Sequence, residues 1–324
     1  MKIAFYDAKK YDIDSFKKYS SQDTIYKFFE AKLNEDTASL SKGFDAVCIF
    51  VNDIADKTVI DILLECGVKL IALRCAGFNN VDIKYAEGKI KVVRVPAYSP
   101  FAVAEHTMAM LLTHIRNTHK AYIRTKSYNF SLSGLCGFDL HGKTVGVIGT
   151  GKIGRIFIDI CKGFGMNVLA YDKYRKNDGT EYATLENLFK QSDIISLHCP
   201  LTDETFHLID KGSIKQMKQG VIIVNTSRGG LIDTEALIDG LKSKKVGGAC
   251  LDVYEEEADV FYEDNSADII DDDMLAVLLS MPNVIITSHQ AFLTEEALEN
   301  IAKTTTQNIQ SFFINGVCEN EVII

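Results

Sequence analysis

Short apolar runs alternate with amphipathic stretches along most of the chain, and the spacing of the apolar positions predicts the elements. In the first hundred residues, three runs rich in β-branched and aliphatic side chains predict strands at 2–6, 46–51 and 70–74, because such side chains suit a pleated, packed surface. Helical spacing predicts helices at about Asp14–Lys32 and Thr58–Glu65. A third helix is expected at about Phe101–Arg116. Its apolar residues lie on almost every side, which is typical of a buried helix.

The pattern is more regular after residue 140. Six apolar runs predict strands at 144–148, 167–171, 194–198, 221–225, 248–251 and 284–287. Helical spacing between the strands predicts helices near 153–164, 185–191, 213–217 and 234–244. Strands this apolar, spaced by helices, indicate a parallel sheet covered on both faces. The fold class is therefore α/β.

A glycine-rich turn follows the strand predicted at 144–148. The strand runs into G-T-G-K-I-G, and an amphipathic helix comes next. In this context Gly149 permits the tight turn, Gly151 lets the backbone approach a pyrophosphate, and Gly154 lets the helix pack on the strand. The N-terminus of the helix offers unpaired N–H groups to the phosphates. The segment therefore predicts a dinucleotide-binding turn.

An acidic residue ends the next strand. Asp172 lies 18 positions after Gly154, close to the spacing expected for the residue that binds the adenosine ribose. Its carboxylate would accept hydrogen bonds from the ribose hydroxyls and repel a 2′-phosphate, which favours NAD over NADP. Lys173 and Arg175 follow, and either cation could tolerate that phosphate, so the residues alone leave NADP open.

Charged side chains follow the last three predicted strands. Arg228 comes after the first of them, Asp252 and the glutamates Glu255–Glu257 after the second, and His289 after the third. In doubly wound sheets, ligands collect beyond the carboxyl ends of the strands. We therefore expect an arginine, an acid and a histidine to meet in one crevice beside the dinucleotide. The spacing alone does not say which glutamate takes part.

Charge and cysteine content exclude several classes of protein. The chain has 324 residues, enough for two domains, and a net charge of −9. That charge argues against binding to nucleic acid or to an anionic membrane surface, and no apolar run is long enough to cross a membrane. The eight scattered cysteines include no C-x-x-C pair, which indicates reduced thiols without a metal site and a cytoplasmic location. The segment Glu255–Asp273 carries ten acidic residues and is expected to be a solvated loop.

The motifs taken together resemble one family. G-T-G-K-I-G, L-H-C-P-L-T, V-N-T-S-R-G-G-L-I-D, L-D-V-Y-E-E-E and S-H-Q-A-F, with the earlier R-C-A-G-F-N-N-V-D and V-P-A-Y-S-P-F-A-V-A-E-H, resemble the D-2-hydroxyacid dehydrogenases. Within that family the chain is most similar to the D-lactate dehydrogenases. The resemblance implies two Rossmann-like, doubly wound domains with a cleft between them. A discontinuous substrate domain would comprise 1–100 and 299–324, and an NAD-binding domain 101–298.

The resemblance also assigns roles to individual residues. It implies that Arg228, Glu257 and His289 are catalytic, and that NAD is the cofactor. The residues expected to bind the substrate are Ala76, Gly77, Tyr98 and Phe292. Those expected to contact NAD are Gly151, Lys152, Ile153, Gly154, Asp172, Cys199, Pro200, Thr205, Thr226, Ser227, Arg228 and Asp252. Family members are usually homodimers built on the NAD domains.

The resemblance implies reversible hydride transfer between NADH and a 2-oxo acid, with pyruvate giving D-lactate, and the residue types agree with this chemistry. Arg228 can bind a carboxylate through its planar guanidinium, and His289 can donate a proton to a ketone oxygen. Glu257 would hold the imidazole and favour its charged form. Two alternatives stay open: a dehydrogenase for a larger branched-chain or aromatic 2-oxo acid, and an NAD-sensing corepressor on the same fold. His106 is expected to have a structural role, and Cys199 is not expected to act as a nucleophile.

Overall fold

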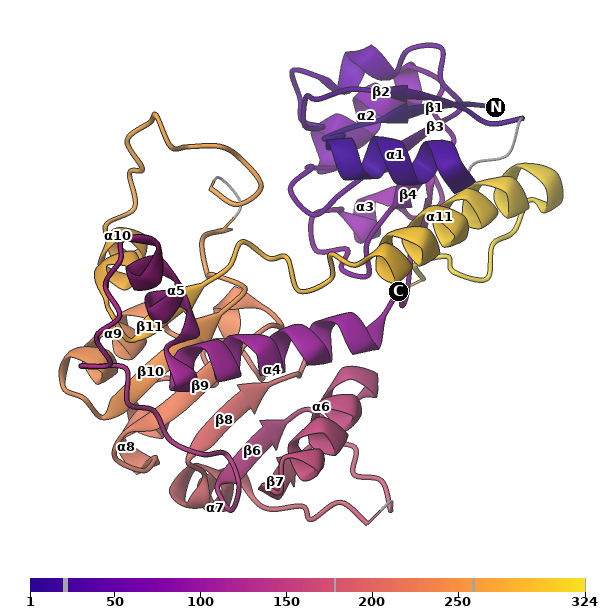
Figure 1. The fold of residues 1–324 in the computed structure, drawn as a ribbon. Helices are drawn as coiled ribbons and strands as arrows, with labels where there is room; N and C mark the ends of the chain where they lie inside the picture. The colour runs from indigo at the N-terminus through magenta and orange to yellow at the C-terminus, as the bar shows by residue number, and fades with distance from the viewer. Residues whose placement is uncertain (20–22, 178, 258–259, 324) are drawn as a thin grey trace. The chain divides into compact units, whose positions relative to one another are not determined.

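A computed structural model describes residues 1–19, 23–177, 179–257 and 260–323. The chain forms two compact units (Figure 1): unit 1 is Met1–Ser99 with Leu293–Ile324, and unit 2 is Pro100–Phe292. The chain returns to unit 1 at Leu293, six residues before the expected position. The last helix starts at Glu295, and its first turn already contacts unit 1, where the Leu298 carbonyl accepts a hydrogen bond of 2.9 Å from the Ser15 hydroxyl.

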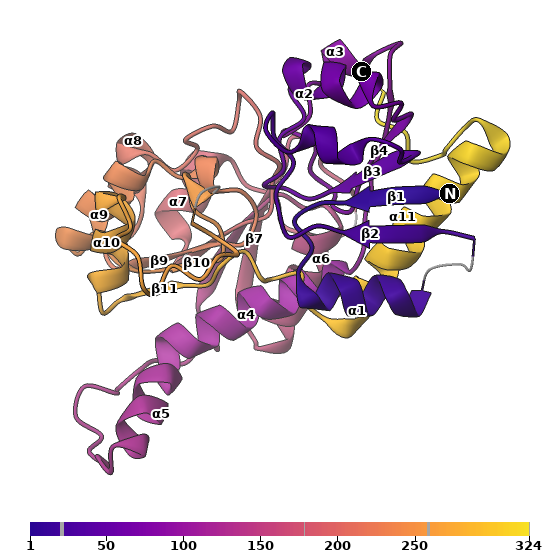
Figure 2. The ribbon, with the colours of Figure 1, turned by 90° about the horizontal axis from the view of Figure 1, so that it is seen from above.

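Unit 1 is built on a five-stranded sheet in the order β2-β1-β3-β4-β5, and every adjacent pair is parallel. The strands are β1 (Lys2–Phe5), β2 (Ile25–Phe28), β3 (Ala46–Ile49), β4 (Leu70–Leu73) and β5 (Lys91–Val93). The helices are α1 (Lys10–Tyr19), α2 (Lys57–Glu65), α3 (Ile83–Ala86), α11 (Glu295–Asn315) and the 3₁₀ turn η1 (Ala38–Ser41). Figure 2 shows α1 and α11 near each other beside the strands, and the two helices are in contact.

The helix predicted at Asp14–Lys32 is wrong in its second half. Helix α1 ends at Tyr19, residues 20–22 lie outside the described part, and Ile25–Phe28 form the edge strand β2. In I-Y-K-F the exposed and half-buried side chains alternate, which is the spacing of a strand. Tyr26 and Phe28 pack against Phe5, and this aromatic contact favours the strand.

Unit 2 is built on a six-stranded parallel sheet in the order β11-β10-β9-β8-β6-β7. Its strands are β6 (Thr144–Ile148), β7 (Asn167–Tyr171), β8 (Ile194–Leu197), β9 (Val221–Asn225), β10 (Val246–Leu251) and β11 (Val284–Ile286). Its helices are α4 (Pro100–Arg116), α5 (Thr118–Lys126), α6 (Lys152–Gly163), α7 (Leu185–Gln191), α8 (Lys211–Gln216), α9 (Thr234–Lys242), α10 (Asp273–Ser280) and the 3₁₀ turn η2 (Gly229–Leu231). The α/β class with two parallel sheets is confirmed.

Both faces of this sheet are covered, as the apolar strands predict. In β9, Ile222 and Val224 belong to one core with residues of α4 and α6, while Val221 and Ile223 belong to a second core with residues of α7 to α10. This alternation follows from the two-residue period of a strand. It explains why β9 is an unbroken apolar run.

The acidic segment largely lacks regular structure. Between residues 260 and 272 the described chain forms neither helix nor strand, and α10 begins at Asp273 with Asp272 as its N-cap; Asp259 lies outside the described residues. Among the residues that the structure describes, no helix is both long and apolar enough to cross a membrane.

Candidate active site

The glycine turn after β6 has the geometry that a dinucleotide phosphate requires. Gly149 has φ of +97°, and a Cβ there would lie 2.5 Å from the carbonyl carbon of His198. A Cβ on Gly154 would lie 2.0 Å from the Gly149 carbonyl oxygen, whereas a Cβ on Gly151 would meet nothing within 4 Å. Helix and strand therefore approach closely, and open space lies before the first amides of α6, which favour anions.

Asp172 follows β7 and faces the glycine turn. Its Oδ2 accepts hydrogen bonds from the N–H of Thr150 at 2.6 Å and from the Thr150 hydroxyl at 3.0 Å, and its Oδ1 accepts the N–H of Tyr174 at 2.7 Å. Partial burial alone would raise the pKa of this carboxyl, but the bonds from Thr150 and Tyr174 outweigh burial and lower the pKa below its ordinary value. The residue is therefore an anion at neutral pH, next to the turn where a ribose would lie.

Arg228 lies on the loop after β9, and that loop is held by its own polar groups. The Asn225 side chain donates to the Arg228 carbonyl at 2.8 Å and accepts the N–H of Ser227 at 3.0 Å, while the Ser227 hydroxyl donates to the Cys199 carbonyl at 2.7 Å. The Arg228 guanidinium donates to the Ser227 carbonyl at 2.7 Å. Within the described residues no carboxylate lies within 4.0 Å of Arg228, so its charge is available to an anionic ligand.

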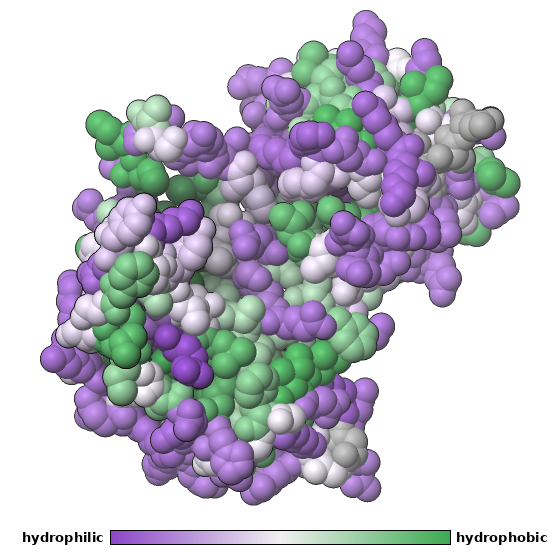
Figure 3. All heavy atoms as spheres, in the orientation of Figure 1, coloured by the Kyte–Doolittle hydropathy of each residue, from purple (hydrophilic) through white to green (hydrophobic). Residues whose placement is uncertain are grey.

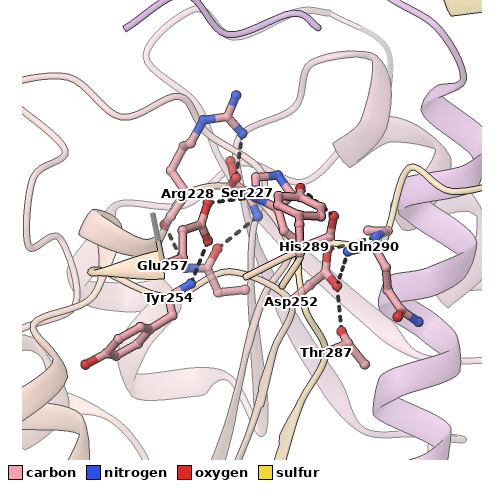
Figure 4. Close-up of polar contacts among 11 residues, drawn as sticks. Ser227, Arg228, Asp252, Tyr254, Glu257, Thr287, His289 and Gln290 are labelled. Atoms are coloured by element: carbon pink, nitrogen blue, oxygen red, sulfur yellow. Dashed lines mark hydrogen bonds and ion pairs between the residues drawn. The ribbon is translucent and has the colours of Figure 1, made fainter. Parts of the chain in front are cut away.

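His289 and Glu257 form a direct pair. Nδ1 of His289 lies 2.7 Å from Oε1 of Glu257, and Oε2 of Glu257 accepts the N–H of Tyr254 at 3.0 Å. Both side chains are about one-fifth exposed. Figure 4 shows the pair with Arg228, on loops that follow β9, β10 and β11. The carboxylate fixes the ring through Nδ1, which leaves Nε2 to exchange a proton with a ligand.

The backbone of His289 is held as firmly as its ring. Its φ is +50°, a left-handed conformation that is costly for a residue with a side chain. Its N–H donates to the Asp252 carbonyl at 2.6 Å, and its carbonyl accepts the Tyr262 hydroxyl at 3.0 Å. The Tyr262 ring centre lies 6.0 Å from that of the imidazole. Sequence reasoning missed Tyr262, because nothing distinguishes it within the acidic segment.

Asp252 is fully buried and binds the turn that carries His289. Oδ1 accepts the Thr287 hydroxyl at 2.5 Å and the N–H of Gln290 at 2.9 Å, and Oδ2 accepts the N–H of Ala291 at 2.9 Å. Nε2 of His106 lies 3.4 Å from Oδ1, and the structural role expected of His106 stays a prediction. The expected contact of Asp252 with the nicotinamide stays a prediction. In the structure, Asp252 also stabilises the turn that carries His289.

In unit 1, the loop after β4 presents two free amides. The N–H groups of Ala76 and Gly77 donate no hydrogen bond within the described chain, although both residues are half-buried. The Ala76 carbonyl, by contrast, accepts a 2.7 Å bond from the Arg94 guanidinium. A backbone N–H without a protein acceptor can donate to a ligand. These two are therefore candidates to bind an anion.

The other predicted site residues lie as follows. Lys152 and Ile153 begin α6, and Thr226 and Ser227 follow β9. Cys199 is buried after β8, with Pro200 exposed beside it, and Thr205 donates to the Pro200 carbonyl at 2.7 Å. In unit 1, the Tyr98 carbonyl accepts a bond of 2.7 Å from Asn300. Phe292, the last residue of unit 2, is buried.

Comparison with known proteins identifies the family. Residues 108–291 match the model of the D-isomer specific 2-hydroxyacid dehydrogenase, NAD binding domain. The chain belongs to this family. It is therefore an NAD-dependent oxidoreductase, and NAD is its cofactor. The turn at Gly149–Gly154 and the anionic Asp172 fit this dinucleotide.

Individual relatives match over the whole chain. D-lactate dehydrogenase of Escherichia coli (strain K12) is 52% identical over 333 residues, which cover 100% of both chains. The apo-structure of D-lactate dehydrogenase from Escherichia coli matches with a TM-score of 0.92 and 49% identity, again covering 100% of both chains. An aromatic 2-oxoacid reductase of Clostridium sporogenes is 43% identical and covers 99% of each chain. Membership of this family implies that the substrate is a small 2-hydroxy or 2-oxo acid.

Proposed function

We propose that the protein reduces pyruvate to D-lactate with NADH, and catalyses the reverse reaction as well. The observation that carries the proposal is the His289–Glu257 pair, 2.7 Å apart, beside an arginine without an acidic partner in the described chain. A proton donor and a carboxylate-binding cation are what a 2-oxo acid requires. The relative named D-lactate dehydrogenase, with 52% identity over the full length, supports pyruvate as the substrate.

The substrate carboxylate requires hydrogen-bond donors and a positive charge. In unit 1, the N–H groups of Ala76 and Gly77 would donate to it, which uses amides that have no other partner in the described chain. In unit 2, the Arg228 guanidinium would supply the positive charge and polarise the ketone of a 2-oxo acid. Tyr98 and Phe292 would surround the substrate's side chain.

The proton comes from His289. Bound NADH supplies a hydride to the ketone carbon. As negative charge develops on the ketone oxygen, Nε2 of the imidazolium donates its proton to that oxygen, and the neutral ring takes it back in the oxidation of lactate. Glu257 stabilises the imidazolium through Nδ1 and keeps the ring in place. The buried Asp252 keeps the loop from shifting, because it binds three groups of the turn.

A larger 2-oxo acid is the second candidate substrate. The relative named aromatic 2-oxoacid reductase, at 43% identity, supports it. Steady-state kcat/KM values for pyruvate, 4-methyl-2-oxopentanoate and phenylpyruvate would separate the two. We expect pyruvate to be preferred by at least ~10-fold over both, because each methylene that a small pocket must exclude costs ~1–3 kcal/mol. A preference for phenylpyruvate would refute pyruvate as the main substrate and keep the mechanism.

We further propose that the enzyme is a homodimer through unit 2. Helix α5 has no buried residue, and exposed apolar side chains occur both on the helix and on the segment that follows it. These are Tyr122, Ile123, Tyr128, Phe130, Leu132 and Phe138. Figure 2 shows this arm extending away from the sheet of unit 2. An arm with so many exposed apolar groups requires a covering surface.

The same unit offers such a surface. A groove between α4 and α6 is lined mostly by apolar side chains, among them Phe101, Met108, Leu112, Ile156 and Ile160. Figure 3 shows hydrophobic residues gathered over α4. A two-fold axis pairs one patch with the same patch on the second copy, so both features would be covered at once. Light scattering should give a mass near twice 36.0 kDa, and Leu132→Asp with Phe130→Asp should give a monomer; a monomeric wild-type protein would refute the dimer.

A cytoplasmic location is also part of the proposal. The eight cysteines are free thiols, which suits a reducing compartment. Cell fractionation should place the protein with cytoplasmic markers, and its recovery in a secreted or membrane fraction would contradict this.

A further inference from the structure

We infer that Arg94 is a positioning residue that turns the Gly77 N–H toward the substrate carboxylate and thereby sets the affinity for the 2-oxo acid. The inference rests on the proposed function, because it assumes that the amides of Ala76 and Gly77 bind that carboxylate. Arg94 follows β5 and belongs to the same unit as both amides. It has no place in the motifs of the dinucleotide turn or of the His289 pair.

Arg94 fixes the orientation of the peptide group between Ala76 and Gly77. Nη1 of Arg94 donates to the Ala76 carbonyl oxygen at 2.7 Å. The peptide from Ala76 to Gly77 is trans, since no cis bond occurs in the described chain. In a planar trans peptide the C=O and the N–H point in opposite directions. Arg94 therefore fixes the carbonyl on one side of the loop, and the Gly77 N–H must face the other side, where it has no protein acceptor in the described chain.

The Arg94 guanidinium also brings a positive charge to this peptide. No carboxylate in the described chain lies within 4.0 Å of the Arg94 guanidinium, which instead packs 5.1 Å from the Phe78 ring centre. Its charge is thus uncompensated by an ion pair and acts on the carbonyl of the peptide. A cation on the carbonyl oxygen polarises the peptide and strengthens its N–H as a donor. Both effects favour an anion at Gly77.

Hydrogen bonds hold the backbone of Arg94 in place. Its carbonyl accepts a 2.8 Å bond from the Asn308 side chain, and its N–H donates to the Asn320 carbonyl at 3.1 Å. Asn308 is buried on α11 and also accepts bonds from Asn320 and Cys318. The C-terminal segment thus holds the backbone of Arg94, which gives the guanidinium a fixed starting point.

The test compares Arg94→Met, Arg94→Gln and Arg94→Lys in the full-length enzyme at saturating NADH. Arg94→Met removes donor and charge, and should raise the KM for pyruvate by at least ~10-fold with a change in kcat below ~3-fold. Arg94→Gln is neutral and shorter, and should do the same. Arg94→Lys keeps a charged donor and should recover most of the affinity. Lys84→Met, at an exposed position of α3 in the same unit, is the control and should keep the wild-type KM.

A binding measurement separates this inference from the proposed function. Oxamate carries the carboxylate but is not reduced, so its dissociation constant from the enzyme–NADH complex reports carboxylate binding without turnover. We expect the constant to rise in parallel with KM in Arg94→Met and Arg94→Gln. A wild-type KM and oxamate affinity in these two variants would overturn the inference. So would a fall in kcat as large as the rise in KM, if Arg94→Lys restored neither. A wild-type enzyme that binds oxamate but reduces no 2-oxo acid would overturn only the proposed function, and a wild-type enzyme that does neither would overturn both.

Discussion

The Glu257 carboxylate joins two elements of the site: Oε1 lies 2.7 Å from Nδ1 of His289, and Oε2 accepts the Tyr254 N–H at 3.0 Å. Glu257→Gln preserves the shape of this contact but removes the charge that stabilises an imidazolium. We expect kcat for pyruvate reduction to fall at least ~10-fold, with a smaller change in KM. Steady-state kinetics would check this. The exposed neighbour Glu256 provides the control, since Glu256→Gln should keep wild-type kcat; equal losses in both variants would contradict the assignment.

His289→Ala removes the proton donor while leaving the dinucleotide turn intact. Proton transfer by a positioned side chain contributes ~10²–10⁴-fold, so kcat should fall by at least ~100-fold. The dissociation constant of NADH, measured by fluorescence, should stay within a few-fold of wild type. His141 is exposed, and His141→Ala should retain full turnover. Turnover near wild type in His289→Ala would exclude this histidine as the acid.

Arg228→Lys keeps the positive charge but not the planar donor group. An ammonium ion cannot form the bidentate contact with a carboxylate, so we expect KM for pyruvate to rise and kcat to fall, each by at least ~10-fold. Arg116→Lys, at the exposed end of α4, should change neither. An unchanged KM and kcat in Arg228→Lys would show that this guanidinium does not bind the substrate.

Asp172 should set the preference for NADH over NADPH. The bonds from Thr150 and Tyr174 lower the pKa of its carboxyl despite partial burial, so the anion persists to lower pH than in an ordinary aspartate. The carboxylate should therefore stay charged throughout the neutral pH range, so its protonation should not alter the preference there. Asp172→Asn should weaken NADH binding and reduce the preference by at least ~10-fold, because the charge that repels a 2′-phosphate is lost. The exposed Asp203 offers a control in Asp203→Asn; an undiminished preference in Asp172→Asn would contradict the role.

Cys199 should not take part in the chemistry. Burial, followed by the charge of Asp172, raises the pKa of this thiol to about 11, so the reactive thiolate is scarce at neutral pH. We expect Cys199→Ser to keep kcat within a few-fold of wild type. At pH 8 a thiol reagent should modify the exposed Cys136 well before Cys199. Loss of turnover on the serine substitution, with NADH binding intact, would argue for a role in catalysis.

The sequence predicts unit 2 better than unit 1, for a physical reason. The central strands β6 and β9 are almost fully buried, and each is a mainly apolar run with the same bounds in the sequence and in the structure. The edge strand β2 is only half-buried, and its mixed pattern is compatible with a helix until its aromatic contacts with Phe5 are known. The three-residue strand β5 is too short to show a period.

Some features of the candidate site can likewise be predicted from the sequence, and others cannot. The ends of parallel strands are predictable, so Arg228, Asp252 and His289 could be placed on one edge of a sheet from the sequence. Spacing alone left three glutamates open, and the family resemblance selected Glu257. The Tyr262 bond to the His289 carbonyl and the Arg94 bond to the Ala76 carbonyl depend on tertiary contacts. No local pattern encodes these contacts.

We propose that Arg228, Glu257 and His289 direct hydride transfer to the face of the 2-oxo acid that gives the D-2-hydroxy acid. The most direct measurement is NADH oxidation by the purified protein with pyruvate, with the lactate enantiomer determined by stereospecific enzymatic assay. We predict rapid turnover with D-lactate as the product. Formation of L-lactate would contradict this proposal. So would a protein that binds NADH but turns over neither pyruvate nor any larger 2-oxo acid.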